Sequence, residues 1–347
     1  MKKLIIAVKN PHYVNNFSAV MPYLKTGTDV EVYFHEDPKA RAHGLELEKN
    51  FDVLIEFDCV EGTRRDVFGY CEAGLLGAKE YYPQIRLPKS LQAMRLHQAM
   101  GDKIVIPAVF NDFDGGRDFT NKHNHPNCEK VVIKREHGAT GDRQVLIDSH
   151  HLSAFLENID LGTTRLKEKF PNAVFIQTKE RAREVGGNLR IEEDQQAKAS
   201  SASASGTEAE DTSDFFTGQD VVITEYIEEV TSEYRVLFSP YTAVAYPRVR
   251  HGKEFPTANM DKSMAVMGSP TLTSSVLTTF GAEGDEIIQE VIKATGLLFG
   301  SIDVFMKDGK IGVFEYQNQF GIVNLDPGLV QTLHREAIEY IARQYYS

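Results

Sequence analysis

Two carboxylates stand in strongly apolar, strand-like segments near the end of the chain. Asp303 lies within residues 301–307 and Glu315 lies within residues 311–317. A carboxylate on an apolar strand is costly unless it is paired or binds a cation. Two such acids on one face, with the amide oxygen of Gln317 beside them, would suit Mg²⁺. The alternative is one solvent-facing acid on each strand.

The loop between these two segments decides whether the acids meet. A two-residue turn at 308–309 would pair Phe314 with Asp303 and place the acids on opposite faces. A three-residue loop at 307–309 would make Glu315 a same-face diagonal neighbour of Asp303, roughly 7–8 Å away. A glycine at the last loop position suits the left-handed conformation that such a loop needs. We therefore predict the three-residue loop and a shared metal site.

Lys134 is a candidate for binding phosphate. It ends the apolar run 131–134 and precedes a loop that contains Gly138 and Gly141. The charge of a lysine and the backbone N–H groups of a glycine-rich loop both suit phosphate oxygens. The alternative is a lysine that extends into solvent before an ordinary turn.

A short connector offers groups that suit a nucleoside. Glu225, Tyr226 and Ile227 follow an apolar strand and precede an acidic turn. Their backbone C=O and N–H groups can pair with the edge of adenine, and the carboxylate of Glu233 can accept hydrogen bonds from ribose hydroxyls. The alternative is an edge strand with solvated acids.

Three arginines lie on neighbouring predicted strands. They are Arg235, Arg248 and Arg250. The planar guanidinium matches carboxylate and phosphate groups, so these side chains are candidates for binding an anionic substrate or its reacting group. The alternative is that they are ordinary surface arginines.

The elements that must position these residues begin with a parallel α/β sheet. Strand and helix signals alternate over the first ~85 residues, which is typical of such sheets. No GxGxxG or GxxxxGK[ST] motif follows these strands, so neither a Rossmann site nor a P-loop is supported. Later strands are expected at 131–134, 144–147, 221–227, 233–238, 242–250, 301–307 and 311–317, with helices beginning near Ser90 and at 286–298 and 329–345.

The order of these motifs resembles the ATP-grasp superfamily. A phosphate lysine with a glycine loop is followed by a hinge with glutamate, a Glu-x-Arg strand, and then Asp and Glu on a hairpin. The likeness covers roughly residues 86–325, and the Glu233–Arg235 pattern is most similar to RimK-like and glutathione-synthetase-like ligases. It implies an α/β fold with a pre-ATP-grasp domain at 1–87 and ATP-grasp sub-domains at 88–224 and 225–347 that sandwich ATP.

The resemblance also implies roles for single residues. Arg95 and Lys134 would contact the ATP phosphates, and the loop from Gly138 to Gly141 would close over them. The hinge 225–227 would hold adenine, Glu233 would hold ribose, and Arg235 and Arg248 would be catalytic. The magnesium ligands would be Asp303, Glu315, Gln317 and Asn318. Two departures stand out. Arg95 replaces the usual lysine, and the last magnesium pair has Gln317, with Asn318 one position later, instead of the usual Glu-x-Asn.

The implied activity is an ADP-forming ligase that joins a carboxylate to an amine through an acyl phosphate, with ATP and Mg²⁺ as cofactors. Its substrate would be a small molecule or peptide with a carboxylate. A small-molecule kinase on the same fold and a non-catalytic ATP-binding protein are the alternatives. Which carboxylate and which nucleophile react, and whether the chain forms a homo-oligomer, stay open.

Charge and composition limit the classes of partner and the location that we expect for this chain. The net charge of −12 argues against a general nucleic-acid binder. No apolar run is long enough to cross a membrane and no export signal is evident, so we expect a cytoplasmic protein. Three cysteines, with no CxxC spacing, imply no disulfide framework. His123, His125 and Cys128 invite a metal interpretation, against which a polar surface turn is the favoured alternative.

One segment differs in composition from the rest of the chain. Residues 191–219 are rich in serine, alanine and acidic residues. Such a segment buries too little apolar surface to offset its ordering entropy, so we predict a disordered insertion. A lid that orders over the substrate is the alternative.

Overall fold

The computed structural model describes residues 3–8, 29–34, 53–60, 80–110, 128–136, 144–176, 182–185, 188–191, 216, 221–248, 274–318 and 327–346. The chain forms two compact units. The first unit comprises Met1–Ile106, Glu229–Arg250 and Met260–Ser347, and the second comprises Pro107–Glu228 and His251–Asn259. These boundaries differ from the domain limits expected after residues 87 and 224, chiefly because the helix that follows residue 88 belongs to the first unit.

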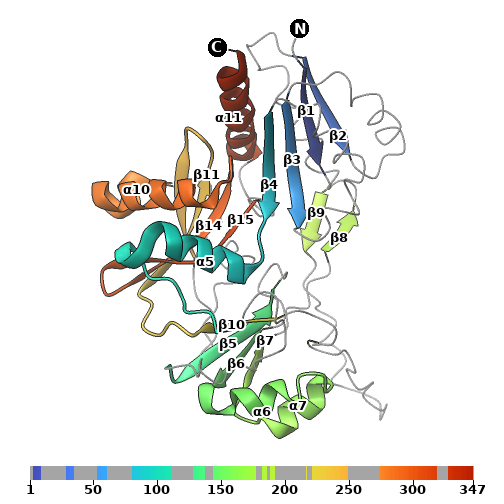
Figure 1. Cartoon of the computed structure of the whole chain (residues 1–347), viewed down its shortest axis with the longest axis vertical. Coiled ribbons are helices and arrows are strands. Elements are labelled where there is room, and N and C mark those ends of the chain that lie inside the picture. The colour runs from blue at the N-terminus through green and yellow to red at the C-terminus, as the bar shows by residue number, and fades with distance from the viewer. Residues whose placement is uncertain are drawn as a thin grey trace. The chain divides into compact units, whose positions relative to one another are not determined.

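The N-terminal part of the first unit is a four-stranded parallel sheet (Figure 1). Its strands are β1 (Lys3–Val8), β2 (Asp29–Phe34), β3 (Val53–Val60) and β4 (Glu80–Arg86), in the order β2-β1-β3-β4. All three strand pairs are parallel. The prediction of a parallel sheet at the start of the chain is therefore confirmed.

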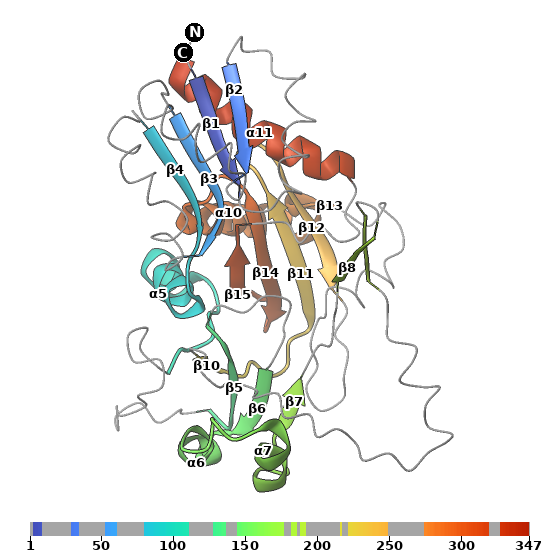
Figure 2. The same ribbon diagram turned by 90° about the vertical axis from the view of Figure 1, so that its right-hand side faces the viewer.

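The C-terminal part of the first unit holds a five-stranded antiparallel sheet in the order β13-β12-β11-β14-β15 (Figure 2). The strands are β11 (Ser232–Phe238), β12 (Ala243–Arg248), β13 (Ser274–Ser275), β14 (Gly300–Lys307) and β15 (Lys310–Gln317). Successive side chains on each strand point to opposite faces of the sheet. One face is apolar and forms the core of this unit, and the other carries the charged residues.

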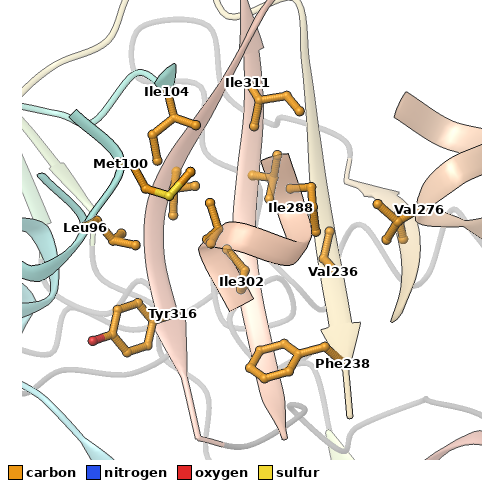
Figure 3. Close-up of a cluster of buried hydrophobic side chains, with 14 of the residues drawn as sticks. Leu96, Met100, Ile104, Val236, Phe238, Val276, Ile288, Ile302, Ile311 and Tyr316 are labelled. Carbon is orange, nitrogen blue, oxygen red and sulfur yellow. The ribbon is translucent and has the colours of Figure 1, made fainter. Parts of the chain in front are cut away.

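Two helices cover the apolar face of this sheet. They are α5 (Lys89–Met100), followed by the 3₁₀ turn η2 (Gly101–Lys103), and α10 (Val276–Thr295). Leu96 and Met100 of α5 pack with Ile288 of α10 and with Ile302 and Val236 of the sheet (Figure 3). This shared core explains why α5 belongs to the first unit. The C-terminal helix α11 (Pro327–Tyr346) is present as predicted.

The second unit is built on a four-stranded antiparallel sheet, β10-β5-β6-β7. The strands are β5 (Lys130–Arg135), β6 (Gln144–Asp148), β7 (Val174–Ile176) and β10 (Val221–Glu225). The short helices η4 (Ser149–His151), α6 (Leu152–Leu156) and α7 (Thr163–Lys169) follow β6. A separate hairpin joins β8 (Ala182–Val185) to β9 (Asn188–Ile191).

One face of this second sheet is packed against α6 and α7. Val131, Val145 and Val221 of the strands meet Phe155 and Leu166 of the helices in a single apolar cluster. Phe216 is fully buried in the same cluster. The prediction of disorder across 191–219 is therefore wrong at Phe216, because a large aromatic ring gains more from burial than its ordering costs. Residues 192–215 and 217–219 lie outside the described residues.

The helices of the described part of the chain include none that is long and apolar enough to cross a membrane.

Candidate active site

The hairpin of β14 and β15 is closed by a two-residue turn. Lys307 pairs with Lys310, and both Asp308 and Gly309 have positive φ, at 51° and 75°. Two consecutive residues of this kind make the turn type that best matches the twist of the flanking strands. The predicted three-residue loop is therefore wrong, since an aspartate can adopt the left-handed conformation that the first turn position requires.

A β-bulge nevertheless brings the two acids together. Val304 pairs with Val313, and Asp303 pairs with Glu315, so Phe314 is an extra residue in β15. Directly opposite residues share a face, with Cβ atoms about 5 Å apart. Asp303 and Glu315 thus lie on one face as predicted, but as direct rather than diagonal neighbours.

Asp303 is held by two arginines from the adjacent strands. Arg235 of β11 donates from Nε to Oδ1 at 2.7 Å and from a terminal nitrogen to Oδ2 at 2.8 Å. Arg248 of β12 lies 3.0 Å from Oδ2. All three side chains are largely buried. The fork-like pairing fixes both Arg235 and Asp303 in position.

These contacts change the titration of both partners. Burial by itself would raise the pKa of Asp303, but the charges of Arg235 and Arg248 and their hydrogen bonds outweigh it and lower that pKa to about 2. Burial likewise acts to lower the pKa of Arg235, and the carboxylate of Asp303 overcomes this and raises it. The cluster is therefore fully ionised at neutral pH.

Other predicted site residues share this face of the sheet. Glu233 is buried and lies directly opposite Arg248 on one side and Phe305 on the other. Gln317 donates from Nε2 to Oε1 of Glu315 at 3.0 Å. Asn318 follows β15 and is buried. The structure thus places Arg235, Arg248, Glu233, Asp303, Glu315 and Gln317 on one surface.

Tyr246 is a member of this face that the sequence did not single out. It lies on β12 directly opposite Arg235 and two residues before Arg248. Its side chain is 2% exposed, and its hydroxyl has no hydrogen-bond partner among the described residues. A tyrosine in an apolar strand normally indicates core packing, so the only signal was its register against Arg235.

The carboxylate and amide oxygens of this face are of the type that Mg²⁺ binds. A carboxylate offers roughly four lone-pair sites. The three arginine contacts use three of those on Asp303, which leaves one on Oδ1. The carboxylate of Glu315 lies opposite, and carboxylate and amide oxygens are the ligands that Mg²⁺ prefers. A metal here would share Asp303 with the arginines.

In the second unit, the predicted hinge is anchored through its backbone. Glu225 ends β10, and its N–H donates to Ala108 O at 2.9 Å. Its carboxylate accepts a hydrogen bond from Ala108 N at 3.4 Å. Tyr226 N donates to Lys130 O at 3.2 Å, and Ile227 is buried. These contacts fix the connector, and its role in binding adenine stays a prediction.

Lys134 lies on the face of the second sheet that α6 and α7 do not cover. It pairs with Gln144 and with Val222. The strand alternation places it with Val132, which packs with Leu146 in a small apolar cluster that also includes Tyr226. A lysine beside an apolar patch is an arrangement that suits a flat ring linked to phosphate. Gly138, Gly141 and Arg250 lie outside the described residues.

Arg95 is engaged within the first unit. It is exposed on α5 and donates to Thr295 O at 3.1 Å, at the C-terminal end of α10. Arginine at this position satisfies a helix-end carbonyl and interacts favourably with the helix dipole. This contact gives Arg95 a structural role, and the proposed contact with phosphate stays a prediction.

The second unit holds a group of side chains that could bind a metal and that the sequence did not single out. Asp148, His150 and His151, at the end of β6 and in η4, have ligand atoms within 4.8 Å of one another. The sequence had instead suggested His123, His125 and Cys128. His123 and His125 lie outside the described residues. Burial, together with the charge of Glu225, raises the pKa of the Cys128 thiol.

Comparison with known proteins gave matches only at the level of structure. No protein-family model matches the chain, and no curated protein matches it. Three similar solved structures illustrate the matches. D-cycloserine synthetase has a TM-score of 0.48 at 12% identity, over 98% of this chain and 100% of the other. D-alanine–D-alanine ligase from Bacillus anthracis has a TM-score of 0.46 at 11% identity, over 99% of each chain.

The third structure is a RiPP-associated ATP-grasp ligase from Chryseobacterium gregarium, with a TM-score of 0.44 at 13% identity, over 99% of this chain and 96% of the other. An ATP-grasp ligase is thus among the solved structures that are similar to this chain. A likeness with TM-scores below 0.5 carries no argument about what the chain does.

Proposed function

We propose that this chain is an ATP-dependent carboxylate–amine ligase of the ATP-grasp type. The observation that carries the proposal is the polar face of the five-stranded sheet, where Asp303 lies opposite Glu315 and is shared by Arg235 and Arg248. Two carboxylates and two guanidinium groups on otherwise apolar strands are costly to maintain for stability alone. They suit a reaction in which anionic groups must be brought together.

Each residue of this face has a task in that reaction. Arg235 is fixed by its paired contacts with Asp303 and presents a positive charge at a constant position. Arg248 lies 3.0 Å from Oδ2 of Asp303 and offers a second guanidinium group for an anionic oxygen of the substrate. Glu315, Asp303, Gln317 and Asn318 supply the oxygen donors for Mg²⁺, which neutralises phosphate charge when it is bound.

The chemistry we propose needs no covalent nucleophile on the protein. A substrate carboxylate oxygen attacks the γ-phosphorus of ATP, the bond to the β,γ-bridging oxygen breaks, and ADP leaves. An amine then attacks the carbonyl carbon of the acyl phosphate, phosphate leaves, and the amine loses a proton. The arginines position the carboxylate and compensate its charge, which is the contribution expected of a preorganised site.

We assign the nucleotide contacts to the residues for which the resemblance implies them. Glu225, Tyr226 and Ile227 would hold adenine and Glu233 the ribose. Lys134 and Arg95 would contact phosphates, together with the loop from Gly138 to Gly141. The apolar patch beside Lys134 supports this assignment. Within the hinge, the N–H groups of Glu225 and Tyr226 already donate to Ala108 O and Lys130 O, so the N–H of Ile227 and the backbone C=O groups are the ones we assign to adenine.

Substrate-dependent ADP release tests the proposal. The assay supplies Mg·ATP with amino acids, short peptides and polyamines, and detects products by mass. We expect ADP and a condensed product whose mass equals the two substrates minus water. Glu315→Gln should lose turnover while still binding ATP. A phosphorylated product that is stable and contains no new amide would instead support the kinase, and no ADP release with any acid would contradict the proposal.

A further inference from the structure

Tyr246 places a buried hydroxyl among the charges of the polar face. Register puts it directly opposite Arg235, and the same strand carries Arg248 two residues later on the same face. Asp303 lies opposite Arg235 on its other side, so the four groups share one face of the sheet. The hydroxyl itself is fully buried and has no hydrogen-bond partner among the described residues.

The hydroxyl is a proton donor at neutral pH, because a phenol ordinarily ionises only at a pKa of about 10. A protonated phenol can donate one hydrogen bond and can accept others. Both guanidinium neighbours are donors only, so the group that completes this arrangement must be an acceptor, and guanidinium groups pair best with anionic oxygens.

An unsatisfied donor in a buried polar cluster is uncommon because its desolvation is uncompensated. Phenylalanine would fill the same space without that cost. The neighbouring tyrosine of β11, Tyr234, lies on the opposite face and packs its ring edge-on against Phe280. Tyr246 has no comparable aromatic contact among the described residues, so its hydroxyl is the feature that distinguishes it from a core residue.

We propose that the Tyr246 hydroxyl donates a hydrogen bond to an anionic oxygen of the acyl substrate, and so forms an oxyanion subsite together with Arg248. The proposal rests on the proposed function, because it names the group that recognises the substrate of that reaction. Arg248 is the arginine that joins Tyr246, since the two lie two residues apart on the same face of β12.

The subsite selects for a substrate class. A carboxylate or phosphoryl oxygen can accept hydrogen bonds from both the phenol and the guanidinium. The NH₂ group of a carboxamide is itself a donor, so it cannot accept a hydrogen bond from either of them. Tyr246 therefore determines specificity for an oxyanion over its neutral amide, because a mismatched group leaves buried donors unpaired.

The test compares Tyr246→Phe with Tyr234→Phe as the matched control on the opposite face of the same sheet. Inorganic phosphate is the oxyanion probe and Mg·ATP the nucleotide probe, both measured by calorimetry. Urea unfolding of the free proteins is measured alongside. For Tyr246→Phe we expect an unfolding midpoint equal to or above that of the wild type. We expect phosphate affinity to fall about tenfold, as for one lost hydrogen bond to a charged group. Tyr234→Phe should bind phosphate as the wild type does.

Three results would overturn the inference. A clearly lower unfolding midpoint for Tyr246→Phe would mean that the hydroxyl has a partner within the protein. Unchanged phosphate affinity in Tyr246→Phe, or no phosphate binding by the wild type, would remove the subsite. A wild-type protein that binds phosphate in a Tyr246-dependent way but does not bind Mg·ATP would instead contradict the proposed function alone.

Discussion

Replacing Asp303 with asparagine tests the ionic cluster that organises the proposed site. The substitution removes the charge that Arg235 and Arg248 share. Breaking a buried pair by removing one partner costs about 3–5 kcal/mol, because uncompensated charge stays buried. Part of that cost depends on pH. The pKa of Asp303 falls from its usual 3.8 to about 2, and a shift of this size corresponds to about 2 kcal/mol of stability.

The sign of the pH dependence follows from the lowered pKa. The contribution of Asp303 is fully present above its unfolded pKa and is lost as the pH falls through its folded pKa, between about 4 and 2. Urea unfolding of the wild type and Asp303→Asn, from pH 7 to pH 2.5, measures the difference directly. We expect a large gap at pH 7 that narrows below pH 4.

Glu290→Gln is the matched control. Glu290 pairs with Lys103 at 2.7 Å, but both side chains are about half exposed, so the pair contributes less than about 1 kcal/mol. If Asp303→Asn were no more destabilising than Glu290→Gln, or if its deficit stayed constant down to pH 2.5, the account of a desolvated and ionised cluster would be refuted.

Two further substitutions test the packing that supports the site. Gly312→Ala should destabilise the protein by about 1–3 kcal/mol in urea unfolding, because a Cβ there would lie 2.1 Å from the buried Phe305 ring. Gly162→Ala is its control: the space around Gly162 is open, so this change should alter stability by less than about 1 kcal/mol. Arg95→Ala should cost about 1 kcal/mol through its contact with Thr295 O, and a larger loss of Mg·ATP affinity than of stability would support a phosphate role.

The hairpin shows what the sequence could and could not predict. The apolar character of both strands and a hairpin around residues 308–309 could be predicted, although its loop was expected to have three residues. The need of Asp303 and Glu315 for partners could also be predicted. The register of the two strands could not be predicted, because a bulge depends on tertiary packing. Phe314 has no partner in the strand pairing, and its ring stacks on that of Phe305 with 4.2 Å between the ring centroids. The sequence around these residues gives no sign of that contact.

Long-range placement was the other limit. The amphipathic pattern of α5 correctly indicated a helix, but it does not tell which sheet Leu96 and Met100 cover, so it could not show that α5 packs on the five-stranded sheet. Tyr246 was missed for the same reason, since only the pairing of β12 with β11 reveals that it lies opposite Arg235. Residue types suggest the chemistry that we propose, whereas pairing between distant strands decides which residues share a face.

Transfer of ¹⁸O from substrate to phosphate tests the central claim most directly. The protein is incubated with Mg·ATP, polyamines and a mixture of amino acids and short peptides whose carboxyl groups carry ¹⁸O, and the inorganic phosphate is analysed by mass. Attack by the carboxylate on the γ-phosphorus predicts one ¹⁸O in each phosphate released. Released phosphate without ¹⁸O, or no phosphate release with any acid, would contradict activation of a carboxylate by this chain.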